Sequence, residues 1–214
     1  CVVCDEEVPQ LLAQLASADR PIREAAARAL GANFSPVARI ATKNYAQKYF
    51  SELHQTLKTG DSEAQHGAMF VLHALGTEAA PVLPEIERFV LGPDPDLARS
   101  AIILARSIGP AAQTLTPTFA SILAGSSNGC RRCVASALGL IGGEQAIPAL
   151  IAVLNDSNAS VRQTACESLG LLGTGSVEVV ASLRPKLKDS DPNVREAAAA
   201  ALARMAPSSP VLTK

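Results

Sequence analysis

The stretch Val161–Gly170, with the sequence VRQTACESLG, decides the fold because Val194–Ala203, VREAAAAALA, repeats its pattern of apolar positions. The same frame begins at four earlier points, so that successive starts lie 42, 33, 33, 31 and 33 residues apart: Ile22, Ala64, Leu97 and Cys130. A period of this size is typical of solenoids made of helix pairs, in which each unit buries its apolar face only against its neighbours. The sequence therefore predicts an all-α fold, a right-handed solenoid of about six antiparallel helix pairs.

Each predicted unit consists of two short amphipathic helices separated by a polar turn. In the last unit these are Val177–Leu187 and Val194–Met205, with the turn Asp189–Asn193 between them. In four units a proline lies 13 residues before the start of the second helix, where it either opens the first helix or bends it: Pro9, Pro84, Pro117 and Pro148. The chain is predicted to form a single domain with units at roughly 5–32, 33–77, 78–109, 110–142, 143–173 and 174–206, followed by a tail at 207–214.

The fifth unit carries a more specific motif than periodicity alone: Ile147-Pro148-Ala149-Leu150, then Leu154-Asn155-Asp156, Val161-Arg162, Ala165, Leu169-Gly170 and Gly173. This motif resembles a HEAT-like repeat, of the short variety first noted in phycobilisome lyases, and the resemblance covers nearly the whole chain. In that family a turn Asp and the Arg after the first apolar residue form a ladder of hydrogen bonds between units. The resemblance implies such a ladder here, with an interruption at Gln65 and Ala98, from three pairs: Asp156 with Arg162, Asp189 with Arg195, and Asp19 with Arg23.

Composition and motifs exclude several classes of function. The net charge is −1 and the pI is about 6.4, so no nucleic-acid partner is predicted. No apolar run approaches the roughly 18 to 20 residues that cross a bilayer. The sequence contains no Gly-rich phosphate loop, G-x-S-x-G elbow or dinucleotide fingerprint, and its histidines, His54, His66 and His73, lack a paired carboxylate motif. The chain is therefore predicted not to be an enzyme, and no catalytic residues, metal site or cofactor are expected.

Five cysteines leave several interpretations open. Cys1 with Cys4, and Cys130 with Cys133, form two C-x-x-C pairs, a spacing found in zinc sites and redox motifs. Cys130 opens a predicted helix next to two arginines, which would lower a thiol pKa, but it also occupies the inward position of Val161. The alternatives are buried small side chains, a structural disulfide, a metal site and redox chemistry, and the first is favoured.

The N-terminal residue suggests a membrane anchor. The chain begins with Cys1, as a mature bacterial lipoprotein does, and a fragment boundary explains the same observation. If Cys1 is lipidated, the protein is exported and its contact with a membrane is limited to that lipid. Otherwise a cytoplasmic location is expected.

The second helices of the units are predicted to line a concave surface. Residues two, six and nine positions after each helix start face outward into this groove if the start itself points inward. In the middle of the array this stripe places two large apolar residues among cationic ones: His66, Phe70, His73, Arg99, Ile103, Arg106 and Arg132. It continues through Ser136, Gly139, Gln163, Glu167 and Gly170. An apolar centre edged by cations is predicted to bind an acidic or mixed protein surface, unless Phe70 and Ile103 pack between adjacent helices.

The sequence thus predicts a non-catalytic scaffold or accessory subunit of a larger assembly, which binds a protein partner through its concave groove. The resemblance to phycobilisome lyases implies one alternative, a phycobilin lyase or isomerase that handles a chromophore. The low aromatic content, 3%, disfavours a tetrapyrrole pocket. A second alternative is an exported, lipid-anchored subunit of a membrane complex.

Overall fold

The computed structural model describes Gln10, Gln14 and residues 42–44, 46–125, 130–173 and 176–205. Over these residues the chain is largely helical and contains no strand, so the predicted all-α solenoid of helix pairs is confirmed. The chain divides into two compact units, Cys1–Ala112 and Gln113–Lys214. The first predicted helix pair, at 5–32, lies almost entirely outside the described residues, as do Cys1, Cys4 and the Asp19–Arg23 pair.

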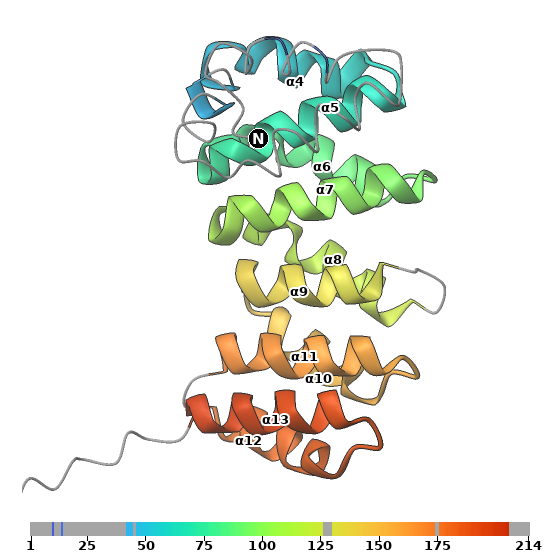
Figure 1. Ribbon diagram of the computed structural model, residues 1–214, viewed down its shortest axis with the longest axis vertical. Helices are drawn as coiled ribbons and strands as arrows, with labels where there is room; N and C mark the ends of the chain where they lie inside the picture. The colour runs from blue at the N-terminus through green and yellow to red at the C-terminus, as the bar shows by residue number, and fades with distance from the viewer. Residues whose placement is uncertain are drawn as a thin grey trace, which may run out of the picture. The chain divides into compact units, whose positions relative to one another are not determined.

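The described part of the first compact unit contains two helix pairs. Helix α4 (Phe50–Thr59) packs on α5 (Ser62–Leu72), and α6 (Leu83–Val90) packs on α7 (Pro95–Ile108). A 3-10 segment, η1 (His73–Val82), joins the two pairs. The two second helices, α5 and α7, also pack on each other, so the pairs are stacked in the order of the sequence (Figure 1).

Three helix pairs make up the part of the second compact unit that the structure describes. The first helices are α8 (Thr116–Ala124), α10 (Ala146–Ala152) and α12 (Val177–Leu183), and the second helices are α9 (Arg131–Ile141), α11 (Ala159–Leu172) and α13 (Pro192–Met205). Short 3-10 segments precede α8 and follow α10 and α12: η2 (Gly109–Leu115), η3 (Val153–Asn155) and η4 (Arg184–Lys188). Helix α11 packs between α9 and α13, and Figure 1 shows these three second helices side by side.

Polar residues at the turns explain where the second helices begin. The side chain of Asp191 accepts hydrogen bonds from the backbone N–H groups of Asn193 and Val194, at 2.8 and 3.3 Å. The same N-cap position is held by Asp61, Asp94 and Asn158 before α5, α7 and α11, and each of these side chains accepts a backbone N–H. Helix α9 is the exception among the described second helices, because Cys130 precedes it without a side-chain cap. Pro192 then occupies the first helical turn, where no N–H is needed. The helix therefore begins two residues before the predicted start at Val194.

Three of the four repeated prolines are described, and they open the first helices rather than bend them; Pro9 lies outside the described residues. Pro84 and Pro117 lie in the first two positions of α6 and α8, and Pro148 is the third residue of α10. The first helix of the last unit, predicted at Val177–Leu187, is shorter than expected, because α12 ends at Leu183 and the chain continues as the 3-10 segment η4. Helix α10 likewise continues as the 3-10 segment η3. The second helices α7 and α9 end at Gly109 and Gly142, which adopt positive φ angles of 66° and 75°.

The core of the second compact unit consists of large apolar side chains and close contacts between helices. Phe119, Leu138, Leu150 and Leu169 are fully buried, and full burial of one such side chain contributes about 1.5–3 kcal/mol. Gly139 and Gly170 are buried too, so their predicted place on the outward stripe is wrong. A Cβ on Gly139 would lie 2.5 Å from Ser168 Oγ, because α9 and α11 approach closely there.

Candidate protein-binding site

Six of the seven predicted binding residues lie in the first compact unit, on α5, at its C-terminal end and on α7. His66, Phe70 and His73 follow one another along α5 and its C-cap, and Arg99, Ile103 and Arg106 occupy the equivalent places on α7. Phe70 is 38% exposed and Ile103 is 41% exposed, so neither side chain is enclosed in the core. Because α5 packs on α7, these two rows belong to one surface, the α5–α7 patch.

The burial pattern of the two helices explains why Phe70 and Ile103 face outward. Met69 and Leu72 of α5 are buried at 2% and 0% exposure, and Ile102 and Leu104 of α7 at 1% each. These neighbours lie on the buried side of each helix. At 3.6 residues per turn, Phe70 and Ile103 then lie on the opposite side of their helices.

His66 is held against its own helix at one end of the patch. Its Nδ1 lies 2.8 Å from the carbonyl oxygen of Ser62. A carbonyl only accepts, so Nδ1 carries the proton in this contact. The neighbouring Asp94 caps α7, and hydrogen bonds from the Leu97 N–H and the Ser62 hydroxyl lower its pKa, with a smaller contribution from His66. This end of the patch is therefore polar and hydrogen-bonded.

His73 and Arg106 form the other end. Burial lowers the pKa of His73, and the charge of Arg106 lowers it further, which favours a neutral imidazole at pH 7. The Nε atom of Arg106 is buried and makes no hydrogen bond within the described residues. Arg99 is exposed. The fixed positive charge of the patch therefore comes from Arg99 and Arg106, with His73 contributing polarity rather than charge.

Arg132, the seventh predicted residue, belongs to the second compact unit. It lies in the first turn of α9 and is exposed. Other exposed apolar side chains of that unit's second helices are Leu140 in α9, at 44%, and Leu171 in α11, at 52%. The sequence stripe did not include these two leucines, because they lie ten positions after each helix start rather than six or nine.

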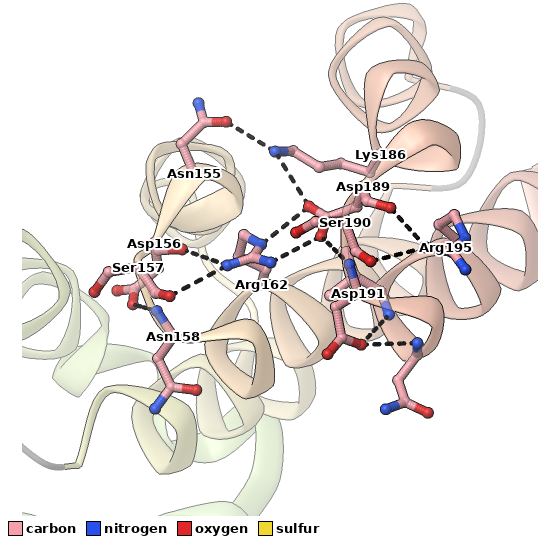
Figure 2. A network of polar contacts seen from close by, with 12 residues as sticks. Asn155, Asp156, Ser157, Asn158, Arg162, Lys186, Asp189, Ser190, Asp191 and Arg195 are labelled. Carbon is pink, nitrogen blue, oxygen red and sulfur yellow. Dashed lines mark hydrogen bonds and ion pairs between the residues drawn. The ribbon is translucent and has the colours of Figure 1, made fainter.

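The predicted ladder between repeats exists, but its pairing differs from the expected one. Arg131 Nε lies 2.7 Å from Asp156 Oδ2. Figure 2 shows the second pair, in which Arg162 donates to both carboxylate oxygens of Asp189, at 3.0 and 2.8 Å. Each of these arginines thus pairs with the carboxylate of the turn Asp in the following unit, not with the carboxylate of the turn Asp in its own unit. Arg162 Nη1 donates to the carbonyl oxygens of its own turn, Asp156 and Ser157, at 2.9 and 3.3 Å.

The two ladder carboxylates are held in the charged form. Burial raises the pKa of Asp156, but the hydrogen bond from Arg131 and its other contacts outweigh burial, so that the pKa is lowered overall. The hydrogen bonds from Arg162 lower the pKa of Asp189 to about 2. The ladder is therefore a structural device of the repeat.

In the described part of the first compact unit, hydrogen bonds without an Arg–Asp ion pair replace the ladder at Gln65 and Ala98. Gln65 Nε2 donates to the carbonyl oxygen of Leu57 at 3.2 Å, and Arg88 Nη2 donates to the same oxygen at 2.6 Å. The Ser62 hydroxyl donates to Asp94 Oδ2 at 2.9 Å and links neighbouring pairs. The predicted interruption is therefore confirmed for the Arg–Asp ion pairs, whereas hydrogen bonds still link the neighbouring helix pairs.

His54 lies away from the other two histidines, next to a buried carboxylate that the sequence did not reveal. Glu85 of α6 is 8% exposed, and its Oε2 lies 3.1 Å from His54 Nε2. Lys58 Nζ lies 3.7 Å from the other oxygen. Lys58 and Glu85 lie on the first helices of their pairs, α4 and α6. The sequence pattern of α6 did not indicate that its glutamate is buried.

The burial of the described cysteines favours their interpretation as structural side chains. Cys130 and Cys166 are buried, at 7% and 0% exposure, while Cys133 is half-buried. Cys133 and Cys166 are free thiols. Burial raises the pKa of Cys166 to about 11, which disfavours the thiolate that redox and metal chemistry require.

The described residues lack two further features. Among them, no group of three or more His, Cys, Asp or Glu side chains is arranged to hold a metal ion. None of their helices combines the length and the apolar character that crossing a bilayer requires.

The sequence matches the HEAT repeat family over residues 84–170 and 147–214, and the chain belongs to this family. No curated protein matches it significantly. Among solved structures, an engineered protein from the Northeast Structural Genomics Consortium is similar with a TM-score of 0.66 and 21% identity, covering 93% of this chain and 96% of that chain. A designed armadillo repeat protein in complex with the peptide (KR)4 is similar with a TM-score of 0.61 and 17% identity, covering 93% and 99%. Computationally designed armadillo repeat proteins for modular peptide recognition are similar with a TM-score of 0.62 and 18% identity, covering 92% of this chain and 99% of that chain. These likenesses establish the fold.

Proposed function

We propose that the chain is a non-catalytic scaffold that binds a protein partner through its second helices, with the α5–α7 patch as the centre of the binding surface. The exposure of Phe70 and Ile103, at 38% and 41%, is the observation that carries this proposal. Neighbouring large apolar side chains on one surface supply the kind of anchor that dominates protein interfaces. Arg132, on the second compact unit, is proposed as a separate contact.

The charge of the patch selects the partner. Arg99 is exposed and the half-buried Arg106 adds a second positive charge, so both favour carboxylates. The similar designed armadillo protein is solved with the basic peptide (KR)4. The patch of the present chain is itself positively charged, so it favours a partner segment of the opposite charge to that peptide. Such a segment is acidic and carries an apolar residue that contacts Phe70 and Ile103.

A displayed library of random peptides tests this proposal on the chain alone. Peptides selected on the wild-type chain are expected to be acidic and to contain a large apolar residue. Their affinity, measured by fluorescence anisotropy, should fall about tenfold or more in Ile103→Asp or Phe70→Asp. Leu171→Asp is the matched control, because Leu171 is 52% exposed on α11, outside the patch. Equal loss of binding in the control, or selection of basic peptides, would reject the α5–α7 patch.

A further inference from the structure

The outer face of α13, the last described helix, exposes positions that α9 and α11 bury. Ala199 is exposed, whereas the residues at the same repeat position, Ala135 in α9 and Cys166 in α11, are 0% exposed. Leu202 is half-buried, whereas its counterparts are both 0% exposed: Leu138 and Leu169. The face of α13 thus has the apolar character of a helix-packing surface without being covered.

The 3-10 segment beside α13 shows the same difference. Leu187 in η4 is 43% exposed, although its counterparts Leu154 and Leu123 are 2% and 5% exposed. In the other compact unit, Leu57 at this position is 0% exposed. A large apolar side chain that is buried in the other pairs is therefore left open in the last one.

The covered helices show what such a face accepts. In α11, the corresponding surface packs on α13, and the two helices approach so closely that a Cβ on Gly170 would lie 2.8 Å from the Cβ of Ala201. Among the described residues, no helix covers α13 in this way.

Arg195 on α13 makes only half of the contacts that Arg162 makes. Its Nη1 donates to the carbonyl oxygens of Asp189 and Ser190, at 2.8 and 3.0 Å, as Arg162 Nη1 does in the preceding turn (Figure 2). Arg162 also donates from Nε and Nη2 to a carboxylate of the following unit. Within the described residues, no carboxylate lies against Nε or Nη2 of Arg195. Its guanidinium is already oriented by its own turn, with the carboxylate-binding edge open.

We propose that this end face, formed by Leu187, Arg195, Ala199 and Leu202, binds a helical hairpin of a partner protein whose turn presents an Asp or Glu carboxylate to Arg195. The partner's hairpin would cover α13 as α13 covers α11, and its carboxylate would complete the ladder. This interface is separate from the α5–α7 patch and does not depend on the function proposed for it.

Two other occupants fit the face less well. The segment Ala206–Lys214, APSSPVLTK, contains no Asp or Glu side chain for Arg195. A second copy docked end to end about a two-fold axis would bring two copies of Arg195 to one interface, and none of the four residues of this face supplies a carboxylate for them.

A peptide of residues 176–205 is the probe, because it carries Asp189 and the surface with which α13 covers α11. Anisotropy of the labelled peptide should show saturable binding to the full chain. Ala199→Glu should reduce affinity about tenfold or more, since it buries a charge in the packing face. Ala200→Glu is the matched control, because Ala200 is exposed and its counterpart on α11, Glu167, is exposed as well. The probe with Asp189→Asn should bind about fivefold more weakly, and Phe70→Asp should not change binding.

Thiol labelling provides a second readout that does not require the short peptide to fold alone. The same residues, fused after Met205 through a flexible linker, act at a high effective concentration. The fused pair should slow alkylation of Ala199→Cys about tenfold and leave Ala200→Cys unchanged. No binding of the peptide together with no protection by the fused pair would overturn the proposal.

Two further results would also overturn it. If Ala199→Cys of the unfused chain labels slowly and truncation after Met205 restores fast labelling, the segment Ala206–Lys214 is the occupant. If sedimentation shows a dimer that Ala199→Glu dissociates, the occupant is a second copy. The proposed hairpin is supported if the chain is a monomer, if Ala199→Cys is alkylated fast, and if adding the probe slows this alkylation.

Discussion

Arg162 donates from Nε and Nη2 to the two carboxylate oxygens of Asp189, at 3.0 and 2.8 Å, across 27 residues of sequence. The two side chains are only 12% and 7% exposed, so this bidentate pair is shielded from solvent. It joins the fifth and sixth predicted units, and Arg131 with Asp156 forms the corresponding link one unit earlier. The relationship ties the turn of one repeat to the helix of the preceding one.

Removing the guanidinium should therefore destabilise the array. Arg162→Gln leaves the buried carboxylate of Asp189 without its bidentate donor, and we expect a loss of about 2 kcal/mol in the free energy of unfolding. Urea denaturation followed by circular dichroism measures this change. Arg132→Gln is the control, because Arg132 is exposed on α9, and it should change stability by less than about 0.5 kcal/mol. Equal effects of the two substitutions would show that the pair does not stabilise the fold.

Acid should weaken the same link. The hydrogen bonds from Arg162 lower the pKa of Asp189 from 3.8 to about 2. A carboxyl group whose pKa is lower in the folded state stabilises the fold above its unfolded pKa, and this contribution disappears as the pH falls from about 4 to 2. The free energy of unfolding of the wild type should decline across this window by up to about 2 kcal/mol more than that of Arg162→Gln. Parallel pH profiles would contradict the assignment.

The close approach of α9 and α11 predicts a strong effect of one methyl group. Gly139→Ala would place a Cβ 2.5 Å from Ser168 Oγ and 3.0 Å from Ser168 Cα, so backbone as well as side chain must shift. We expect a loss of about 1–3 kcal/mol in the free energy of unfolding, despite the higher helix propensity of Ala. Gly125→Ala is the control, since its new Cβ would have no neighbour closer than 3.5 Å. A stabilised Gly139→Ala protein would show that the helices are farther apart than described.

The cysteines should differ in reactivity. Cys166 is 0% exposed, and burial raises its pKa to about 11, whereas Cys133 is half-buried. At pH 8, iodoacetamide should therefore modify Cys133 well before Cys166, as followed by mass spectrometry of peptides. In denaturant the two rates should become similar. Rapid native labelling of Cys166 would show that α11 opens more readily than its packing indicates.

The helix pairs and their period could be predicted from the sequence because both depend on local rules. The spacing of apolar positions, the turn residues Asp189–Asn193 and the helix-ending glycines each act within a few residues of the chain. The outward position of Phe70 and Ile103 followed from the same periodicity. Their role in binding, and the contribution of Arg132, stay predictions.

Only the tertiary structure decided the contacts that cross from one repeat to the next. The sequence placed Asp156 with Arg162, but the distance between stacked units pairs Asp156 with Arg131 instead. Gly139 was expected in the groove, yet the close approach of α9 and α11 buries it. The open edge of Arg195 became visible only beside the completed pair of Arg162. Sequence patterns specify which face of a helix is apolar, whereas the separation and offset of neighbouring helices depend on how all their side chains pack together.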